Sequence, residues 1–243
     1  MDPTPFGLWP SPISAGDLAT ATRFRDVAWD ADGRTLVWLE NRGPQGVLVC
    51  QPPGEAPRDL NTTLSVRAKV GYGGGDFAIA RGHVYFAEYS GRLYRQALAG
   101  GPAQPITPQF GGAAAPAPSP DGRHLVYVHS DEGRDVLAII DCGGRAWPQI
   151  LVEGADFYMQ PVWHPRGDRL AWIEWDHPQM PWDGTRLVLG YIVKSRDGLP
   201  RLRDRSPLAG DLDTSISQPC FSPDGRYLVY ASDQRGYSNL WCY

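Results

Sequence analysis

The side chains best suited to chemistry lie close together in one short segment of the sequence. This segment combines carboxylate, imidazole and indole groups in Glu174, Trp175, Asp176, His177, Trp182 and Asp183. Acids in such a set can bind a cation, for example the amino terminus of a peptide, while the indole rings contact apolar side chains. The alternative is a structural loop between two strands, stiffened by two prolines, with its tryptophans packed against a neighbouring element. The sequence leaves both interpretations open.

Two further chemistries fit this segment less well. Asp176, His177 and Asp183 are of metal-ligating types, but nothing in their spacing fixes a coordination geometry. A pair of acids could also work as in a glycosidase, yet the distance between two carboxylates cannot be read from sequence. We therefore predict no metal and no cofactor.

The glycine run Gly71–Gly75 resembles a phosphate-binding loop only superficially. Such loops need a helix after the glycines and usually end in Gly-Lys-Ser/Thr. Here Asp76 and Phe77 lead into a strand instead, so the run is interpreted as a tight turn between elements. The histidines outside the segment occur singly in strand or turn positions and are interpreted as structural: His83, His124, His129 and His164.

A repeated turn-plus-strand pattern supplies the elements that must position these residues. Its clearest copies are Pro118-Ser-Pro-Asp-Gly-Arg-His-Leu-Val-Tyr127 and Phe221-Ser-Pro-Asp-Gly-Arg-Tyr-Leu-Val-Tyr230. In each turn Pro presets φ, Asp bonds back to the backbone, and Gly accepts the positive φ that closes the hairpin. The run that follows is rich in β-branched and aromatic residues, as in a buried strand. The anchor glycines of the five copies are Gly33, Gly82, Gly122, Gly167 and Gly225.

A unit of this length with three or four short antiparallel strands predicts one blade of a β-propeller. We therefore expect an all-β fold with about five four-stranded blades and an incomplete ring. The blades are expected at 25–60, 72–107, 112–152, 157–208 and 216–243, after an N-terminal extension or closing segment at 1–24. Only residues 14–22 favour a short helical turn. A β-sandwich also has many strands and turns, but it does not need this repeat.

Composition agrees with many short elements joined by turns. The 243 residues include 28 glycines and 23 prolines, and 42% of the chain is hydrophobic. The formal net charge of −4, with acids interleaved among the arginines, argues against binding to nucleic acid or to an anionic membrane surface. No apolar run is long enough for a membrane span, and the N-terminus lacks the pattern of a signal peptide. The four cysteines stand singly and are expected to be reduced, so a cytoplasmic location is the default.

The repeat resembles two kinds of propeller. It is similar to TolB-type propellers and to the N-terminal propellers of prolyl oligopeptidase-family serine peptidases, including the acylaminoacyl peptidase and dipeptidyl aminopeptidase branch. Three parts of the sequence favour the peptidases: Phe6–Ser14; Gly71–Ala78 followed by Val84–Phe86 and Arg92–Arg95; and Glu174–Asp183. The resemblance implies a propeller that sits over an α/β-hydrolase active site and admits only short or unfolded peptides.

The chain departs from that family in one respect. The hydrolase domain of such a peptidase needs a nucleophile elbow of the form G-x-S-x-G, and these 243 residues contain none. The resemblance thus implies a propeller truncated before its catalytic domain, with a peptide substrate or a hydrolase domain as its partner. The alternative is a standalone TolB-like propeller that binds a peptide or a protein. An incomplete ring would expose sheet edges, which predicts oligomers or poor solubility.

Overall fold

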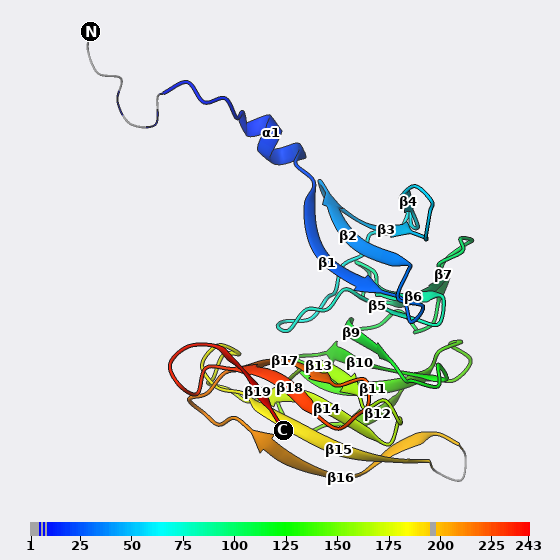
Figure 1. The fold of residues 1–243 in the computed structure, drawn as a ribbon, viewed down its shortest axis with the longest axis vertical. Coiled ribbons are helices and arrows are strands. Elements are labelled where there is room, and N and C mark those ends of the chain that lie inside the picture. Colours follow the sequence, from blue (N-terminus) through cyan, green and yellow to red (C-terminus); the bar gives the residue numbers. More distant parts are fainter. Residues whose placement is uncertain (1–4, 6, 8, 195–197) are drawn as a thin grey trace.

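The computed structural model describes residues 5, 7, 9–194 and 198–243, and it is an all-β propeller with five antiparallel sheets (Figure 1). The predicted fold class and the predicted number of blades are confirmed. Four sheets have four strands, and the fifth has three. Among the described residues, no helix is long and apolar enough to cross a membrane.

Each blade is a simple meander in which consecutive strands pair. Blade 1 contains β1 (Arg23–Trp29), β2 (Leu36–Arg42), β3 (Gln45–Gln51) and β4 (Arg58–Asp59). Blade 2 contains β5 (Phe77–Ala80), β6 (His83–Ala87), β7 (Leu93–Ala97) and β8 (Gln104–Pro105). Blade 3 contains β9 (Gly112–Pro118), β10 (His124–Asp131), β11 (Arg134–Asp141) and β12 (Gln149–Val152). Blade 4 contains β13 (Phe157–Trp163), β14 (Arg169–Trp175), β15 (Arg186–Lys194) and β16 (Pro200–Ala209). Blade 5 contains β17 (Ile216–Phe221), β18 (Leu228–Ser232) and β19 (Asn239–Cys242).

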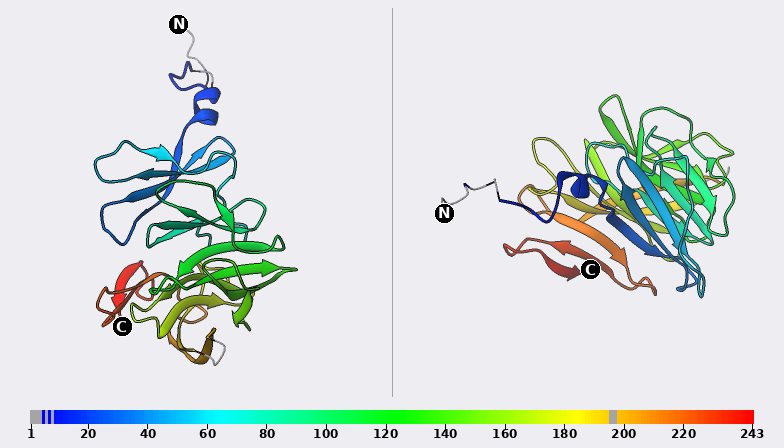
Figure 2. Two further views of the ribbon diagram at one scale, coloured as in Figure 1. Left: turned by 90° about the vertical axis from the view of Figure 1, so that its right-hand side faces the viewer. Right: turned by 90° about the horizontal axis from the view of Figure 1, so that it is seen from above.

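The blades are arranged around a common axis (Figure 1), and in the view turned by 90° their sheets lie one above another (Figure 2, left). The first strands of successive blades contact one another, so β1, β5, β9, β13 and β17 lie nearest the axis. Four separate apolar clusters fill the four interfaces between neighbouring blades. Leu39 and Phe86 belong to the cluster between blades 1 and 2, whereas Trp172 belongs to the cluster between blades 3 and 4. The core is therefore a series of layers, each shared by two sheets.

The repeated turn has the chemistry that its sequence predicts. In blade 3 the Gly122 amide donates to the Ser119 carbonyl at 2.8 Å, and Ser119 Oγ donates to Asp121 Oδ1 at 2.7 Å. Gly122 has φ +70°, a conformation that favours glycine. The turn of blade 5 has the same pattern, with Ser222 Oγ donating to Asp224 Oδ1 at 2.6 Å.

A β-bulge recurs in the innermost strand of the last three blades. The pairing register shifts within β9, β13 and β17. At the shifts Ala115, Gln160 and Gln218 adopt positive φ values of 48°, 50° and 56°. Each of these residues precedes a proline. The bulges bend the strands that line the axis, as bulges generally do.

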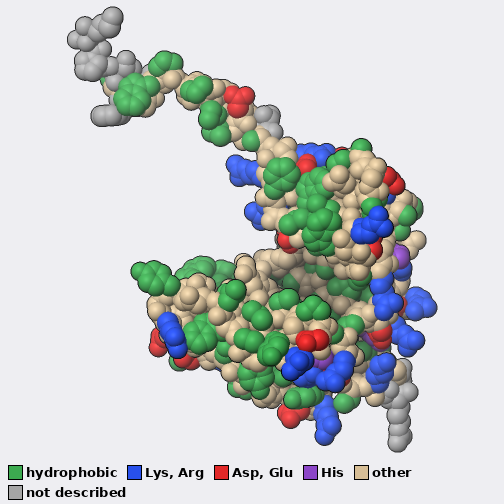
Figure 3. Space-filling view, viewed as in Figure 1, with side chains coloured by type: hydrophobic (Ala, Val, Ile, Leu, Met, Phe, Trp, Pro, Cys, Tyr) green, Lys and Arg blue, Asp and Glu red, His purple; other side chains and the backbone are tan. Residues whose placement is uncertain are grey.

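The two terminal blades each leave one face uncovered. On blade 1 this face carries Phe24, Val27 and Trp29, which are 74%, 59% and 61% exposed. On blade 5 it carries Leu240, 79% exposed, on the edge strand β19. Figure 3 shows an open gap between these blades on one side of the molecule. This arrangement agrees with the expected incomplete ring.

A short helix precedes the first blade, as residues 14–22 predict. Helix α1 (Ala15–Thr20) begins with a capping box in which Ser14 and Asp17 exchange hydrogen bonds. It projects away from β1 and pairs with no sheet (Figure 1). Of the N-terminal segment that resembles the peptidases, Phe6 and Leu8 lie outside the described residues. The division of the chain at residue 24 stays a prediction.

One buried acid makes the stability of the propeller depend on pH. Asp135 on β11 is 6% exposed, and its Oδ2 has no hydrogen-bond partner among the described residues. Burial raises the pKa of this carboxyl group. Because the pKa of Asp135 is higher in the folded chain than in the unfolded chain, folding favours its protonated form. The free energy of unfolding is therefore highest below the unfolded pKa of about 4 and falls as the pH rises through the folded pKa.

We expect Asp135→Asn to raise the free energy of unfolding at pH 7 by about 1 kcal/mol, because it removes a poorly solvated charge. The gain should disappear as the pH approaches 4. Urea unfolding at several pH values measures this difference, with Asp213→Asn at an exposed position as the control. A lower stability of Asp135→Asn at pH 7 would contradict the prediction.

Candidate functional site

The segment Glu174–Asp183 begins at the end of β14 and continues into the β14–β15 loop. Because side chains alternate along a strand, Glu174 and Trp175 point to opposite faces of blade 4. Glu174 shares its face with Trp172 and lies toward blade 3, whereas Trp175 belongs to the cluster between blades 4 and 5. The alternation therefore divides the predicted site into a polar part and an aromatic part.

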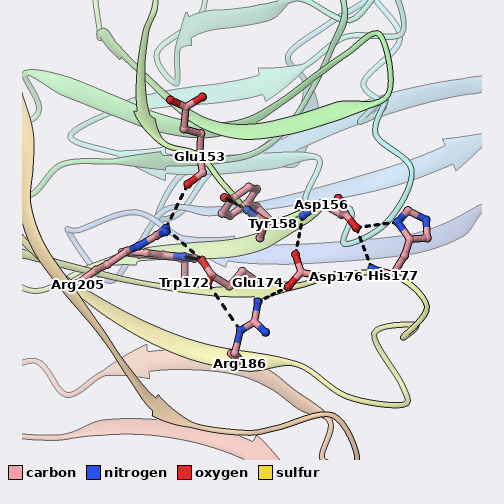
Figure 4. Close-up of polar contacts among 10 residues, drawn as sticks. Glu153, Asp156, Tyr158, Trp172, Glu174, Asp176, His177, Arg186 and Arg205 are labelled. Carbon is pink, nitrogen blue, oxygen red and sulfur yellow. Dashed lines mark hydrogen bonds and ion pairs between the residues drawn. The ribbon is translucent and has the colours of Figure 1, made fainter.

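Glu174 is the centre of the polar part (Figure 4). It is 8% exposed and pairs in register with Tyr158 on one side and Arg186 on the other. Trp172 Nε1 donates to Glu174 Oε2 at 2.8 Å. Two guanidinium groups approach the same carboxylate, with Arg186 Nε at 3.8 Å and Arg205 Nη1 at 3.7 Å. A buried charge is tolerable only when it is paired in this way.

Arg186 links this carboxylate to the outer acids. Its Nη2 donates to Asp176 Oδ2 at 2.6 Å, and this bond raises the pKa of the guanidinium. Asp176 Oδ1 accepts the backbone N–H of Asp156 at 3.0 Å. The Asp156 carboxylate in turn accepts the backbone N–H and the Nδ1 of His177, both at 2.9 Å. These two bonds lower the pKa of Asp156, with the backbone bond as the larger cause.

The polar part carries more negative than positive charge. Three carboxylates, two guanidinium groups and one imidazole lie in this network: Asp156, Glu174, Asp176, Arg186, Arg205 and His177. The side chains of Asp156 and His177 are 51% and 70% exposed, so they form its solvent-facing end. An incoming cation can reach this end, whereas Glu174 is already neutralised by its two arginines.

The aromatic part is a cluster of rings from two distant pieces of chain. Trp175, 1% exposed, stacks on Phe157 with ring centroids 5.1 Å apart. Tyr72 meets Phe157, Trp175 and Trp182 edge-on, at 5.3, 6.3 and 6.3 Å. Trp182 is 64% exposed and forms the outer end of the cluster. The ring of His177 lies 4.8 Å from Phe157 and connects the aromatic part to the polar part.

Sequence reasoning missed Tyr72, which belongs to the glycine run. This run is part of the connection between blades 1 and 2, yet it reaches blade 4. Gly73, at φ +93°, lies so close to β13 that an added Cβ would be 2.5 Å from Met159 Cβ. Only glycine allows this approach, so the run serves to bring Tyr72 against the aromatic cluster.

The structure brings five of the six predicted residues into these two connected parts and leaves Asp183 apart. Asp183 Oδ2 accepts the Met180 backbone N–H at 3.0 Å, which closes a turn of the loop. Within the described ranges no group of three or more His, Cys, Asp or Glu side chains is arranged to hold a metal ion. The missed polar partners are Asp156, Arg186 and Arg205, which lie on neighbouring elements.

Comparison with known proteins gives relatives among solved structures. A puromycin-hydrolyzing peptidase of Mycobacterium tuberculosis superposes with a TM-score of 0.81 at 30% sequence identity. A puromycin hydrolase superposes with a TM-score of 0.81 at 28% identity. In both cases the match covers 98% of this chain and 40% of the other. The chain thus spans two fifths of the length of these proteins.

More distant structures share the fold alone. TolB from Acinetobacter baumannii matches 90% of this chain and 51% of its own, with a TM-score of 0.61 at 15% identity. No protein-family model and no curated protein sequence matches the chain.

Proposed function

The structural neighbours of this chain are propeller domains of prolyl oligopeptidase-family peptidases and TolB-like propellers, and from this premise we propose that it is the substrate-access propeller of a serine peptidase acting on short peptides. The observation that carries the proposal is the match at 28–30% identity along 98% of the chain, confined to 40% of the puromycin hydrolases. The partner of such a propeller is an α/β-hydrolase domain that supplies the chemistry.

The physical role of the propeller in this proposal is that of a filter. A ring of rigid blades over an active site admits an extended peptide and excludes a folded protein. It also limits the access of bulk water to an acyl-enzyme intermediate. The layered cores between the blades provide the rigidity that such a filter needs.

The candidate site would recognise a peptide as it passes. The net negative charge at the outer end, around Asp156 and Asp176, suits a peptide amino terminus. The exposed ring of Trp182 and the imidazole of His177 suit its first side chains. This role uses the half of the network that faces solvent and leaves Glu174 as its buried support.

The alternative is a standalone TolB-like propeller that binds a peptide or protein. The likeness to TolB rests on 15% identity and shows the fold alone. The closer match therefore favours the peptidase-associated role.

An assay with the 243-residue chain tests the absence of chemistry in this part of the protein. We expect no turnover of aminoacyl or acyl-aminoacyl nitroanilides and no labelling by a fluorophosphonate probe, because the sequence contains no nucleophile elbow. Labelling of a serine would show that the chain has its own nucleophile, and the proposal would fail.

The recognition role is tested by exchanging the matching segment of a puromycin hydrolase for this chain. In that chimera Asp156→Asn with Asp176→Asn should raise KM about tenfold for peptides with a free amino terminus, because the acids that attract the cation are lost. KM for the same peptides with an acetylated amino terminus should not change. Asp213→Asn is the matched control, and equal effects on both peptide classes would exclude amino-terminal recognition.

A further inference from the structure

A slot opens on the face of blade 3 that is turned toward blade 2, away from the network around Glu174. Blade 2 ends in β8, which has two residues, so its outer part covers little of the facing sheet of blade 3. Tyr127, Val136 and Ala138 of that sheet line the resulting cavity of about 410 Å³. Blade 3 itself continues outward through β12 and forms the far wall.

Large apolar side chains stand exposed at the mouth of this slot. Trp147 is 66% exposed, Ile150 60% and Phe110 40%. The rings of Phe110 and Trp147 lie nearly parallel, with an interplanar angle of 7° and centroids 6.0 Å apart. His129 meets Phe110 edge-on at 4.7 Å. Single exposed apolar residues are ordinary, but three around one cavity are typical of a binding site.

The floor of the slot is aromatic. Tyr127 is 2% exposed, and its side chain lines the cavity beside Val136 and Ala138. Burial raises the pKa of this phenol, so it presents a neutral side chain to a ligand. An aromatic floor of this kind suits contact with the ring of a ligand side chain.

The rim of the slot is acidic. Asp131, Glu132 and Glu153 line it, together with one cation, Arg134. Arg134 Nη2 lies 3.5 Å from Glu153 Oε2, an exposed pair that leaves the two carboxylates of the β10–β11 turn without an opposite charge on the rim. The charge of the rim therefore complements a cationic ligand.

We propose that this slot binds a peptide segment in which an aromatic side chain adjoins lysine or arginine residues. The aromatic ring packs against Trp147, Phe110 and Ile150, and the neighbouring cation reaches Asp131 and Glu132. A cation over the indole face adds a further attraction. The inference is independent of the proposed role in a peptidase, because it uses other blades and other residues.

Calorimetric titration of the 243-residue chain with acetyl-Lys-Phe-Lys-amide tests the proposal. We expect saturable binding that is at least tenfold weaker for acetyl-Lys-Ala-Lys-amide and for acetyl-Glu-Phe-Glu-amide. Trp147→Ala should weaken binding about tenfold, whereas Trp29→Ala, which removes an equally exposed indole on blade 1, should not. Glu132→Gln should weaken binding severalfold and reduce its dependence on salt.

Each of these titrations has an outcome that would overturn the proposal. Absence of saturable binding, or equal binding by Trp147→Ala and the unsubstituted chain, excludes the slot as the site. Phenethylamine that binds as tightly as the peptide would assign the slot to free arylalkylamines instead. Circular dichroism verifies the fold of Trp147→Ala, and Glu132→Gln provides a second test at an exposed position between β10 and β11.

Discussion

Replacement of Trp172 by alanine is expected to lower the free energy of unfolding by about 3–5 kcal/mol. Trp172 is fully buried in the cluster between blades 3 and 4 and is among the largest buried side chains there. Its ring fills the space above Gly190, where an added Cβ would lie 2.7 Å from the indole Cζ3. Alanine would leave a cavity and would also remove the N–H that donates to the buried Glu174 carboxylate.

Urea unfolding measures this loss, and two variants separate its causes. Trp172→Phe keeps much of the packing but lacks the indole N–H, so it should lose only part of the free energy, about 1–3 kcal/mol. Trp29→Ala removes an indole that is 61% exposed and should change stability by less than about 0.5 kcal/mol. A loss below about 1 kcal/mol for Trp172→Ala would mean that this interface contributes little to stability.

The fold could be predicted because its signals are local. The turn at Ser119, Asp121 and Gly122 is encoded by the residues that form it, and its copies recur along the chain. The turn chemistry, the strand that follows and the period together specify a blade. No long-range information is needed to expect a propeller from such a repeat.

The site could be predicted only in part, because its contacts are made across strands. Period-two alternation alone would have placed Glu174 and Trp175 on opposite faces. The partners of Glu174 depend on register: Arg186 pairs with it directly, while Arg205 lies on β16, where the pairing with β15 shifts twice. Such shifts cannot be read from the sequence of one strand.

Tyr72 shows a second limit of prediction from the sequence. The glycines of its run indicate a special backbone, and the interpretation as a turn between repeated units agrees with their place between β4 and β5. Where the turn leads depends on the packing of Gly73 against Met159, which is distant in sequence. The same run that closes one connection thus completes an aromatic cluster on another blade.

The 243-residue chain, expressed alone, is expected to self-associate at micromolar concentrations. Blade 1 exposes Val27 and Trp29, which share a face with their pairing partners Trp38 and Leu36. Blade 5 exposes Leu240 on β19, whose outer edge has no pairing strand among the described residues. Uncovered apolar faces and free strand edges both favour association between chains.

Trp29→Lys combined with Leu240→Lys should weaken self-association at least tenfold, because each lysine places a charge on an apolar face that association would bury. Sedimentation velocity over a range of concentrations measures this shift. Tyr191→Lys on blade 4, where the replaced ring is 47% exposed, is the matched control and should leave association unchanged. A sharp monomer boundary for the unsubstituted chain at every concentration, with cooperative melting, would show instead that the terminal blades are stable with their faces open. In that event the exposed apolar residues of blades 1 and 5 would be compatible with a stable monomer. The rigidity of the five-bladed propeller would then have to come from the four apolar clusters between the blades alone.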